Sequence, residues 1–365
     1  MAKILVAMSG GVDSSVAAAL LLQQGHEVVG AYMKNWINEE GLPGDCPWQQ
    51  DIIDARSVAD HLGIELRILS LMDAYRERVV DYMLKGYRDG VTPNPDVMCN
   101  REMKFGVFRD FALGQGFDAI ATGHYARIRQ NAEGEGVDVL RGMDGNKDQT
   151  YFLALLQQEQ ISKVLFPVGE LPKSEVRSEA ERFEIPVAKK KDSQGICFMG
   201  NVKMADFLKH YIKDQPGDIV TVDGKVVGQH QGLHLYTFGQ RKGLRVSSPV
   251  YGKAYVLVEK RPQSNELVVA FDELDTPNLY ASRCQVTSIS LTHRPLSTAE
   301  NLSAQPRYRC PSVAIKLLEQ NDNGSTMTIE FDQPQRALTP GQICAFYDGE
   351  VLMGGGVFQQ IDYSS

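Results

Sequence analysis

The stretch "ILVAMSGGVDSSVAAALL", residues 4–21, decides the expected fold. An apolar run is followed by Ser9-Gly10-Gly11-Val12-Asp13-Ser14 and then by small and apolar residues that favour a helix. Glycines between a strand and a helix let the backbone approach a ligand, and a helix N-terminus binds anions through its N–H groups and dipole. The sequence therefore predicts a phosphate-binding loop, with the hydroxyls of Ser9 and Ser14 as further donors.

Two familiar phosphate loops are excluded by spacing. The stretch lacks the G-x-x-x-x-G-K-[ST] pattern and lysine of a Walker A loop, and it is not G-x-G-x-x-G, which disfavours a dinucleotide site. The simpler alternative is a glycine-rich turn in which Asp13 acts as a helix-capping acid.

Strand-like and helix-like segments alternate over the first 200 residues. Strands are expected at 3–7, 26–34, 64–70 and 117–128, and helices at 14–24, 49–62, 73–86 and 101–116. This alternation predicts an α/β fold with a parallel sheet covered by helices, whose ligand lies at the carboxyl ends of the strands.

The second part of the chain has a different pattern. Short alternating strands joined by Asp-Gly, Asn-Gly or glycine-rich turns follow residue 200. We therefore expect three domains: a catalytic domain at 1–204, a small β-rich central domain at 205–277, and a C-terminal β-barrel at 278–365.

Composition narrows the class of protein. The 365 residues are 43% hydrophobic and 23% charged, and no apolar run approaches the roughly 20 residues that cross a bilayer. Because the N-terminus has neither a signal-peptide nor a transit-peptide layout, we expect a cytoplasmic protein without membrane contact. The net charge of −8 gives no overall attraction for nucleic acid, so such a partner needs local basic patches. Candidates are 189–191, 240–245 and 307–309.

Six cysteines stand apart at 46, 99, 197, 284, 310 and 344, and none forms a C-x-x-C pair. This argues against a zinc ribbon and against an iron–sulfur cluster. Cys99 follows Asp96, a suitable N-cap, and has Arg101 and Lys104 nearby, so its thiol pKa should fall; a buried cysteine on the inner helix face is the alternative. Cys197 follows three lysines, which favour a thiolate, although such a run is often only a solvated face. The other four are expected to be structural or incidental, in β-like segments or, for Cys46, in a loop.

The loop resembles the PP-loop of N-type ATP pyrophosphatases, which cleave ATP between the α and β phosphates and adenylate a substrate oxygen. Further segments resemble the tRNA 2-thiouridylase family within that group: "YMKNW" (32–36), "TPNPDVMCNREMKF" (92–105), "ATGHYAR" (121–127), "GNKDQTYFL" (145–153), "DSQGICF" (192–198) and "GQHQGLHLYTFGQRKGL" (228–244). The similarity runs from residue 4 to about 360.

The resemblance implies roles for particular residues. ATP binding is implied for Ala7, Met8, Ser9, Gly10, Gly11, Val12, Asp13, Ser14, Met33 and Gly123. Contacts to the target uridine are implied for Asn94, Pro95 and Asp96. Contacts to tRNA are implied for His124, Lys147, Asp148, Gln149, Arg307, Tyr308 and Gln342. An aspartate beside phosphates fits if Mg²⁺ lies between them, so Asp13 is expected to contact ATP-bound Mg²⁺ rather than a protein-only metal site.

The implied reaction is ATP-dependent 2-thiolation of uridine 34 in tRNAs of the Lys, Glu and Gln type. Cys197 would carry a persulfide from a sulfur-relay protein of the TusE type fed by a cysteine desulfurase, and Cys99 would attack it as nucleophile, leaving a transient Cys99–Cys197 disulfide. Asp96 is either an acid or base at the ring or only a helix cap. The alternative is a small-molecule PP-loop synthetase of the argininosuccinate or GMP synthetase type, which leaves both cysteines and the β-rich half unexplained.

Overall fold

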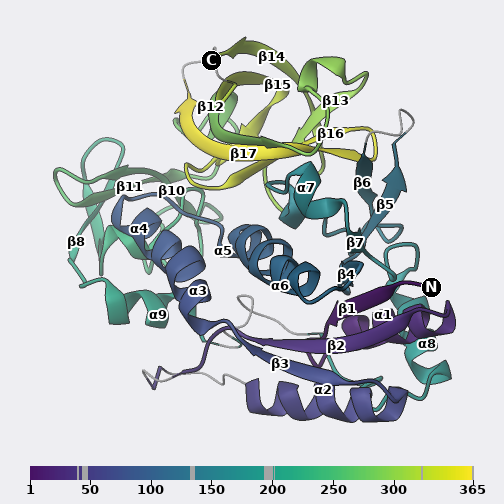
Figure 1. The fold of residues 1–365 in the computed structure, drawn as a ribbon. Coiled ribbons are helices and arrows are strands. Elements are labelled where there is room, and N and C mark those ends of the chain that lie inside the picture. Colours follow the sequence, from purple (N-terminus) through teal and green to yellow (C-terminus); the bar gives the residue numbers. More distant parts are fainter. Residues whose placement is uncertain are drawn as a thin grey trace.

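The computed structural model describes residues 1–38, 41–42, 48–131, 136–192, 200, 202–321 and 324–363. Its N-terminal part is a five-stranded sheet in the order β3-β2-β1-β4-β7, and every neighbouring pair is parallel (Figure 1). The strands are β1 (Lys3–Ala7), β2 (Glu27–Lys34), β3 (Leu66–Ser70), β4 (Ala119–Ala121) and β7 (Val164–Leu165). The predicted parallel α/β sheet is confirmed.

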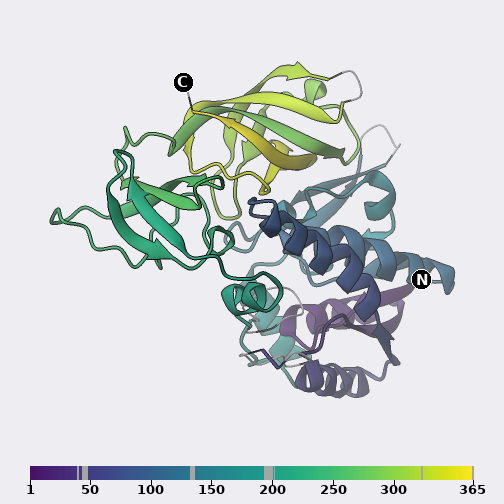
Figure 2. The ribbon, with the colours of Figure 1, turned by 90° about the vertical axis from the view of Figure 1, so that its left-hand side faces the viewer.

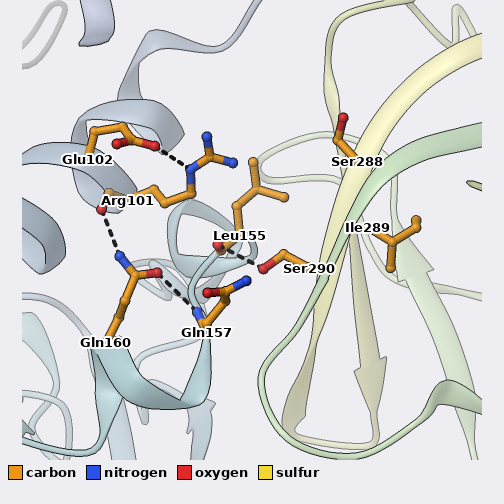
Figure 3. A pocket seen from close by; sticks show the side chains of 8 residues that line it. All are labelled: Arg101, Glu102, Leu155, Gln157, Gln160, Ser288, Ile289 and Ser290. Atoms are coloured by element: carbon orange, nitrogen blue, oxygen red, sulfur yellow. Dashed lines mark hydrogen bonds and ion pairs between the residues drawn. The ribbon is translucent and has the colours of Figure 1, made fainter. Parts of the chain in front are cut away.

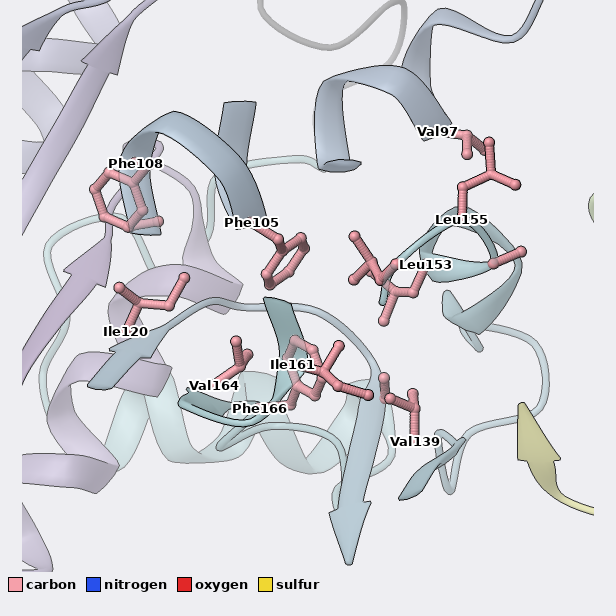
Figure 4. Close-up of a cluster of buried hydrophobic side chains, with 14 of the residues drawn as sticks. Val97, Phe105, Phe108, Ile120, Val139, Leu153, Leu155, Ile161, Val164 and Phe166 are labelled. Carbon is pink, nitrogen blue, oxygen red and sulfur yellow. The ribbon is translucent and has the colours of Figure 1, made fainter. Parts of the chain in front are cut away.

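Alternation along β1 separates two cores. Ile4 and Val6 pack with α1 (Val12–Gln23), α2 (Trp48–Leu62) and α8 (Lys173–Arg182) on one face. Leu5 and Ala7 point to the other face, where the helical segment 95–114 lies. Figure 4 shows side chains of that helical segment beside those of β4 and β7. The central strand β1 is thus buried on both sides, as is usual in parallel sheets.

The helical segment 95–114 is made of three parts: α5 (Pro95–Met98), the π-helical η2 (Cys99–Val107) and α6 (Phe108–Gly114). Its N-cap is Asn94, whose side-chain oxygen accepts a hydrogen bond from the Val97 N–H at 3.2 Å. The prediction that Asp96 is the cap is therefore wrong. Pro95 occupies the first helical position, where its fixed φ and missing N–H are tolerated. The cap is therefore the residue before Pro95, two residues before Asp96.

The predicted strand at 117–128 is also wrong as a single element. It divides into β4 and β5 (Ala126–Gln130), and β5 pairs with β6 (Val137–Arg141), which pairs with β17 (Val351–Asp362). The chain leaves the parallel sheet at Gly123, where a Cβ would lie 2.6 Å from the Ser14 nitrogen. β5 and β6 consequently belong to the sheet of the C-terminal barrel.

Six strands close the C-terminal barrel: β12 (Tyr280–Leu291), β15 (Thr326–Arg336), β14 (Val313–Gln320), β13 (Leu302–Gln305), β16 (Ile343–Asp348) and β17. Pairing of β17 with β12 completes the ring, and β6 and β5 extend the sheet beyond β17. The barrel and the helical segment 95–114 share one apolar cluster, which includes Ile343 and Phe105.

A smaller mixed sheet lies to one side of the barrel (Figure 2). Its order is β10-β11-β8-β9, formed by β8 (Gly217–Thr221), β9 (Val226–His230), β10 (Tyr255–Arg261) and β11 (Glu266–Phe271). The remaining helical elements are α3 (Met72–Tyr75), η1 (Arg76–Val80), α4 (Asp81–Arg88), η3 (Thr150–Leu153), α7 (Gln158–Ile161), α9 (Met204–Tyr211), η4 (Leu233–Leu235) and η5 (Leu296–Thr298). Within the described residues, none of the helices combines the length and apolar character needed to span a membrane.

Candidate active site

The loop at residues 9–14 joins the carboxyl end of β1 to α1. Gly10 has a φ of +74°, and a Cβ on it would lie 2.5 Å from the Asp51 carbonyl oxygen. The buried Ser14 hydroxyl donates to the Gly11 carbonyl at 3.2 Å and accepts from the Ser9 N–H at 3.2 Å. Ser14 therefore holds the loop in shape, while Ser9 is exposed. The first N–H groups of α1 lack intrahelical acceptors and lie where an anion would bind.

We expect Gly10→Ala to lower the free energy of unfolding by about 2–4 kcal/mol, because it adds left-handed strain and a backbone clash. Gly25→Ala is the matched control, because Gly25 has a φ of +83° and nothing within 4 Å of an added Cβ. Urea unfolding of both variants measures the difference. Equal losses in the two variants would show that contact with Asp51 is unimportant.

Asp13 is held by two residues that are distant in sequence. The Tyr125 hydroxyl donates to Asp13 Oδ1 at 2.9 Å, and the Lys173 ammonium donates to the same oxygen at 2.6 Å. Burial, and then the neighbouring Asp13 charge, raises the pKa of Tyr125, so its phenol remains a donor. Lys173 is a site residue that the sequence reasoning missed.

Asp192 connects three cations beside the loop. It accepts from Lys147 at 2.7 Å, Lys173 at 2.8 Å and Arg177 at 2.9 Å. Burial alone would raise the pKa of Asp192, but hydrogen bonds from the two lysines outweigh it and lower the pKa to about 2. Lys147, Lys173 and Arg177 thus gather beside the loop, each paired with Asp192, and Lys173 is also paired with Asp13.

Lys190 links the loop to α2. Its ammonium donates to the Gly10 carbonyl at 3.1 Å, to Asp51 at 2.8 Å and to Asp54 at 2.6 Å. Because these contacts hold its charge, the prediction that all of 189–191 serves as a basic patch for nucleic acid is wrong at Lys190.

The segment 92–99 is positioned by the barrel. The Gln342 side-chain amide donates to the Thr92 carbonyl at 2.7 Å and to the Pro93 carbonyl at 3.3 Å. Asn94, Pro95 and Asp96 are half-buried at the start of the helical segment that follows. Cys99 is fully buried, in a cluster with Met103. Gln342 therefore fixes the position of the segment that is expected to hold the target base.

Comparison with known proteins finds relatives over nearly the whole chain. Residues 2–201 match the family described as tRNA methyl transferase HUP domain, 205–271 the tRNA methyl transferase PRC-barrel domain, and 281–358 the Aminomethyltransferase beta-barrel domain. A protein of Akkermansia muciniphila named tRNA-specific 2-thiouridylase MnmA is 56% identical over 364 residues, covering 99% of this chain and 100% of that protein. The chain belongs to the tRNA-specific 2-thiouridylase family.

A second member of the 2-thiouridylase family, from Pseudomonas fluorescens (strain Pf0-1), is 45% identical over 98% of this chain and 94% of its own length. The structure titled as a 4-thiouridine synthetase–RNA complex with bound ATP is 17% identical, with a TM-score of 0.35, over 55% of this chain and 45% of that chain. That likeness is too weak to carry an argument.

The residues expected to contact tRNA in this 2-thiouridylase-family chain divide into two groups. Asp148 and Tyr308 line one hollow of about 540 Å³ together with Arg141 and Arg309. Asp148 also accepts from Arg141 at 2.7 Å. Other expected contacts are occupied within the protein: Gln149 accepts from the Tyr125 N–H at 3.0 Å, and Arg307 donates to the Ala337 carbonyl at 2.9 Å.

A second hollow, of about 350 Å³, lies between the helical segment 95–114 and the barrel (Figure 3). Arg101 and Glu102 form one wall, and Ser288 and Ser290 of β12 form the opposite one. The Ser290 hydroxyl donates to the Leu155 carbonyl at 3.0 Å. Neither hollow is lined by the loop at residues 9–14.

His124 lies in the core instead of on an open surface. Its Nδ1 is 2.7 Å from the Thr122 hydroxyl, and its ring packs against Phe105 and Phe166. Burial, reinforced by the Lys104 charge, lowers its pKa well below the usual value. The histidine is therefore neutral in the folded protein at neutral pH.

This pKa shift predicts acid sensitivity. Below about pH 6.5 the unfolded chain protonates His124 while the folded protein does not. The free energy of unfolding therefore decreases as the pH is lowered, by at most about 1.4 kcal/mol per pH unit. When the pH is lowered from 8 to 5.5, we expect the free energy of unfolding to decrease less in His124→Gln than in the wild-type protein. The exposed His210→Gln serves as control. An unchanged pH dependence in His124→Gln would contradict the assignment.

The remaining cysteines and several residues expected to bind ATP lie in different parts of the fold. Cys284 and Cys344 are buried in strands, and burial raises the pKa of the Cys284 thiol to about 12. Cys310 is half-buried in a turn, not in a strand as predicted. Cys46 and Cys197 lie outside the described residues. Ala7 and Met33 belong to one buried cluster, and Met8 and Val12 to the cluster on the other face of the sheet.

Proposed function

We propose that this protein is a tRNA-uridine 2-sulfurtransferase. It adenylates the C2 oxygen of uridine 34 with ATP and then transfers sulfur from a cysteine persulfide, giving 2-thiouridine, AMP and pyrophosphate. The supporting observation is 56% identity over 99% of the chain to a protein named for 2-thiouridylation. The matched domain descriptions mention methyl transfer, but relatives that match almost the full length carry the thiouridylase name.

The chain's own groups account for the adenylation step. The N–H groups at the start of α1 bind the pyrophosphate part of ATP, and Lys173, Lys147 and Arg177 offset its charge. Because these groups already lie beside the loop, they do not have to rearrange when ATP binds.

Mg²⁺ bound with ATP would supply further charge neutralisation, and Asp13 is the proposed contact. The fit is limited, because Asp13 Oδ1 already accepts from Tyr125 and Lys173. Among the described residues there is also no cluster of three or more His, Cys, Asp or Glu side chains able to hold a metal ion. Mg²⁺ is proposed to arrive with the nucleotide.

Cys197 is proposed to carry the persulfide and Cys99 to attack it as nucleophile, leaving a Cys99–Cys197 disulfide that must be reduced. The sulfur comes from a relay protein of the TusE type, and the tRNA partners are those of the Lys, Glu and Gln type, in the cytoplasm. Because Asn94 is the helix cap, Asp96 is released from that role and is proposed as the acid or base at the uracil ring.

The test measures pyrophosphate release from ATP with and without tRNA carrying uridine 34, followed by a thiol-retarding gel of that tRNA. We expect release to depend on tRNA and the gel to show a retarded band when a persulfide donor is supplied. Release that ignores tRNA and responds to a small amine would favour the synthetase alternative.

A further inference from the structure

Asn35 follows directly after β2, at the carboxyl edge of the parallel sheet. The residue is 2% exposed, and within the described structure neither Oδ1 nor Nδ2 has a hydrogen-bond partner. A buried carboxamide without partners costs stability, and most buried polar groups in proteins are paired. Hydrogen bonding within the described structure therefore does not explain an asparagine at this position.

Asn38, three residues further on, shows what a structural asparagine looks like in the same segment. Its Nδ2 donates to the Leu42 carbonyl at 2.8 Å, and its Oδ1 accepts from the Leu42 N–H at 2.8 Å. Both ends of the Asn38 amide are thus hydrogen-bonded to the Leu42 backbone. The two residues form a matched pair of identical side chains with opposite hydrogen-bonding states.

The surroundings of Asn35 place it between the two halves of the reaction site. Met33, two residues earlier, shares an apolar cluster with Ala7 at the end of β1 and with Val97. Trp36, one residue later, belongs to the cluster that contains Cys99. Asn35 is therefore flanked by the cluster at the phosphate-loop strand and by the cluster around the candidate nucleophile.

The chemistry of the side chain indicates the ligand. A carboxamide is neutral and offers one acceptor and two donors in a plane, so it complements the donor–acceptor edge of a nucleobase and is unsuited to neutralising a phosphate. Building on the proposed function, we propose that Asn35 is a nucleobase-binding residue of the sulfur-transfer site. The base is either the adenine of ATP or the target uracil, which share this edge chemistry. Because Asn35 is covered, the side chains over it must move aside as the base binds.

The experiment compares Asn35→Leu with Asn38→Leu. Asn35→Leu should leave the melting temperature unchanged or raise it by about 2–4 °C, because it removes an unpaired buried amide, whereas Asn38→Leu should lower it. For each variant, the dissociation constants of ATP and of pyrophosphate are measured without tRNA, and kcat/KM for tRNA is measured at saturating ATP. Asn35→Ser serves as a smaller, polar variant if the leucine variant does not fold.

We expect Asn35→Leu to weaken one base-dependent constant by about 10- to 100-fold while pyrophosphate binding stays unchanged. A loss for ATP identifies adenine, and a loss for tRNA alone identifies uracil; both support the proposal. Equal losses for ATP and pyrophosphate would mean a disturbed phosphate site and would overturn it, as would unchanged constants for ATP and tRNA.

The two proposals fail in different ways. Wild-type protein that never thiolates tRNA would remove the sulfurtransferase assignment. The comparison of ATP with pyrophosphate binding needs no tRNA, so an ATP-specific loss in Asn35→Leu would still support base binding by Asn35.

Discussion

Replacing Lys173 with methionine is expected to slow tRNA-dependent pyrophosphate release by about 100- to 1000-fold. The Lys173 ammonium is the cation that contacts Asp13 in the phosphate loop, and it also contacts Asp192. Its loss leaves the Asp13 carboxylate facing the phosphates without that charge, so two negative groups repel each other in the transition state. Steady-state release of pyrophosphate at saturating ATP measures the effect.

Arg177→Met provides the matched control for Lys173→Met. Arg177 shares Asp192 with Lys173, and none of its hydrogen bonds reaches Asp13. We expect a smaller loss of rate than in Lys173→Met, because Arg177 adds positive charge beside the loop without contacting Asp13. A similar loss in both variants would show that the Asp192 cluster matters as a unit and that contact with Asp13 has no special role.

Cys197→Ser is expected to abolish tRNA thiolation while tRNA-dependent pyrophosphate release continues near the wild-type rate. A serine hydroxyl cannot carry a persulfide, whereas adenylation of the uridine does not use the Cys197 sulfur. The thiol-retarding gel measures sulfur in the tRNA, and pyrophosphate release in the same reaction measures adenylation.

Cys310→Ser is the companion variant for Cys197→Ser, because Cys310 is half-buried in a turn and has no proposed role. It should thiolate tRNA normally. If Cys197→Ser instead lost both activities, the persulfide assignment would have no support from this experiment.

The phosphate loop could be predicted because its information is local. The strand, the glycine pair and the start of α1 lie within about 20 residues, and the glycine at position 10 is required by a positive φ and by the approach of Asp51. The closed barrel was also predictable, because alternating strands and turn residues carry the pattern. In contrast, the helix cap was misassigned by two residues, because the sequence analysis took Asp96 as the cap, whereas Pro95 occupies the first helical position and leaves Asn94 as the cap.

The charge arrangement around the loop could not be predicted. Asp13 meets Lys173 across 160 residues, and Lys190 meets Asp51 across 139. From sequence alone, a lysine in a run is predicted to be a solvated surface charge. Only the fold shows that a carboxylate distant in sequence lies beside it. Asn35 is a further case, because a lone asparagine after a strand gives no sign that both amide atoms will be buried without partners.

The division of the 117–128 segment has a mechanical consequence. Tyr125, which donates to Asp13, is followed at once by Ala126, the first residue of the strand that extends the barrel sheet. Only four residues, 122–125, separate that sheet from β4 of the parallel sheet. This short segment therefore links the barrel sheet to the phosphate loop through the hydrogen bond between Tyr125 and Asp13 and through the close approach of Gly123 to Ser14.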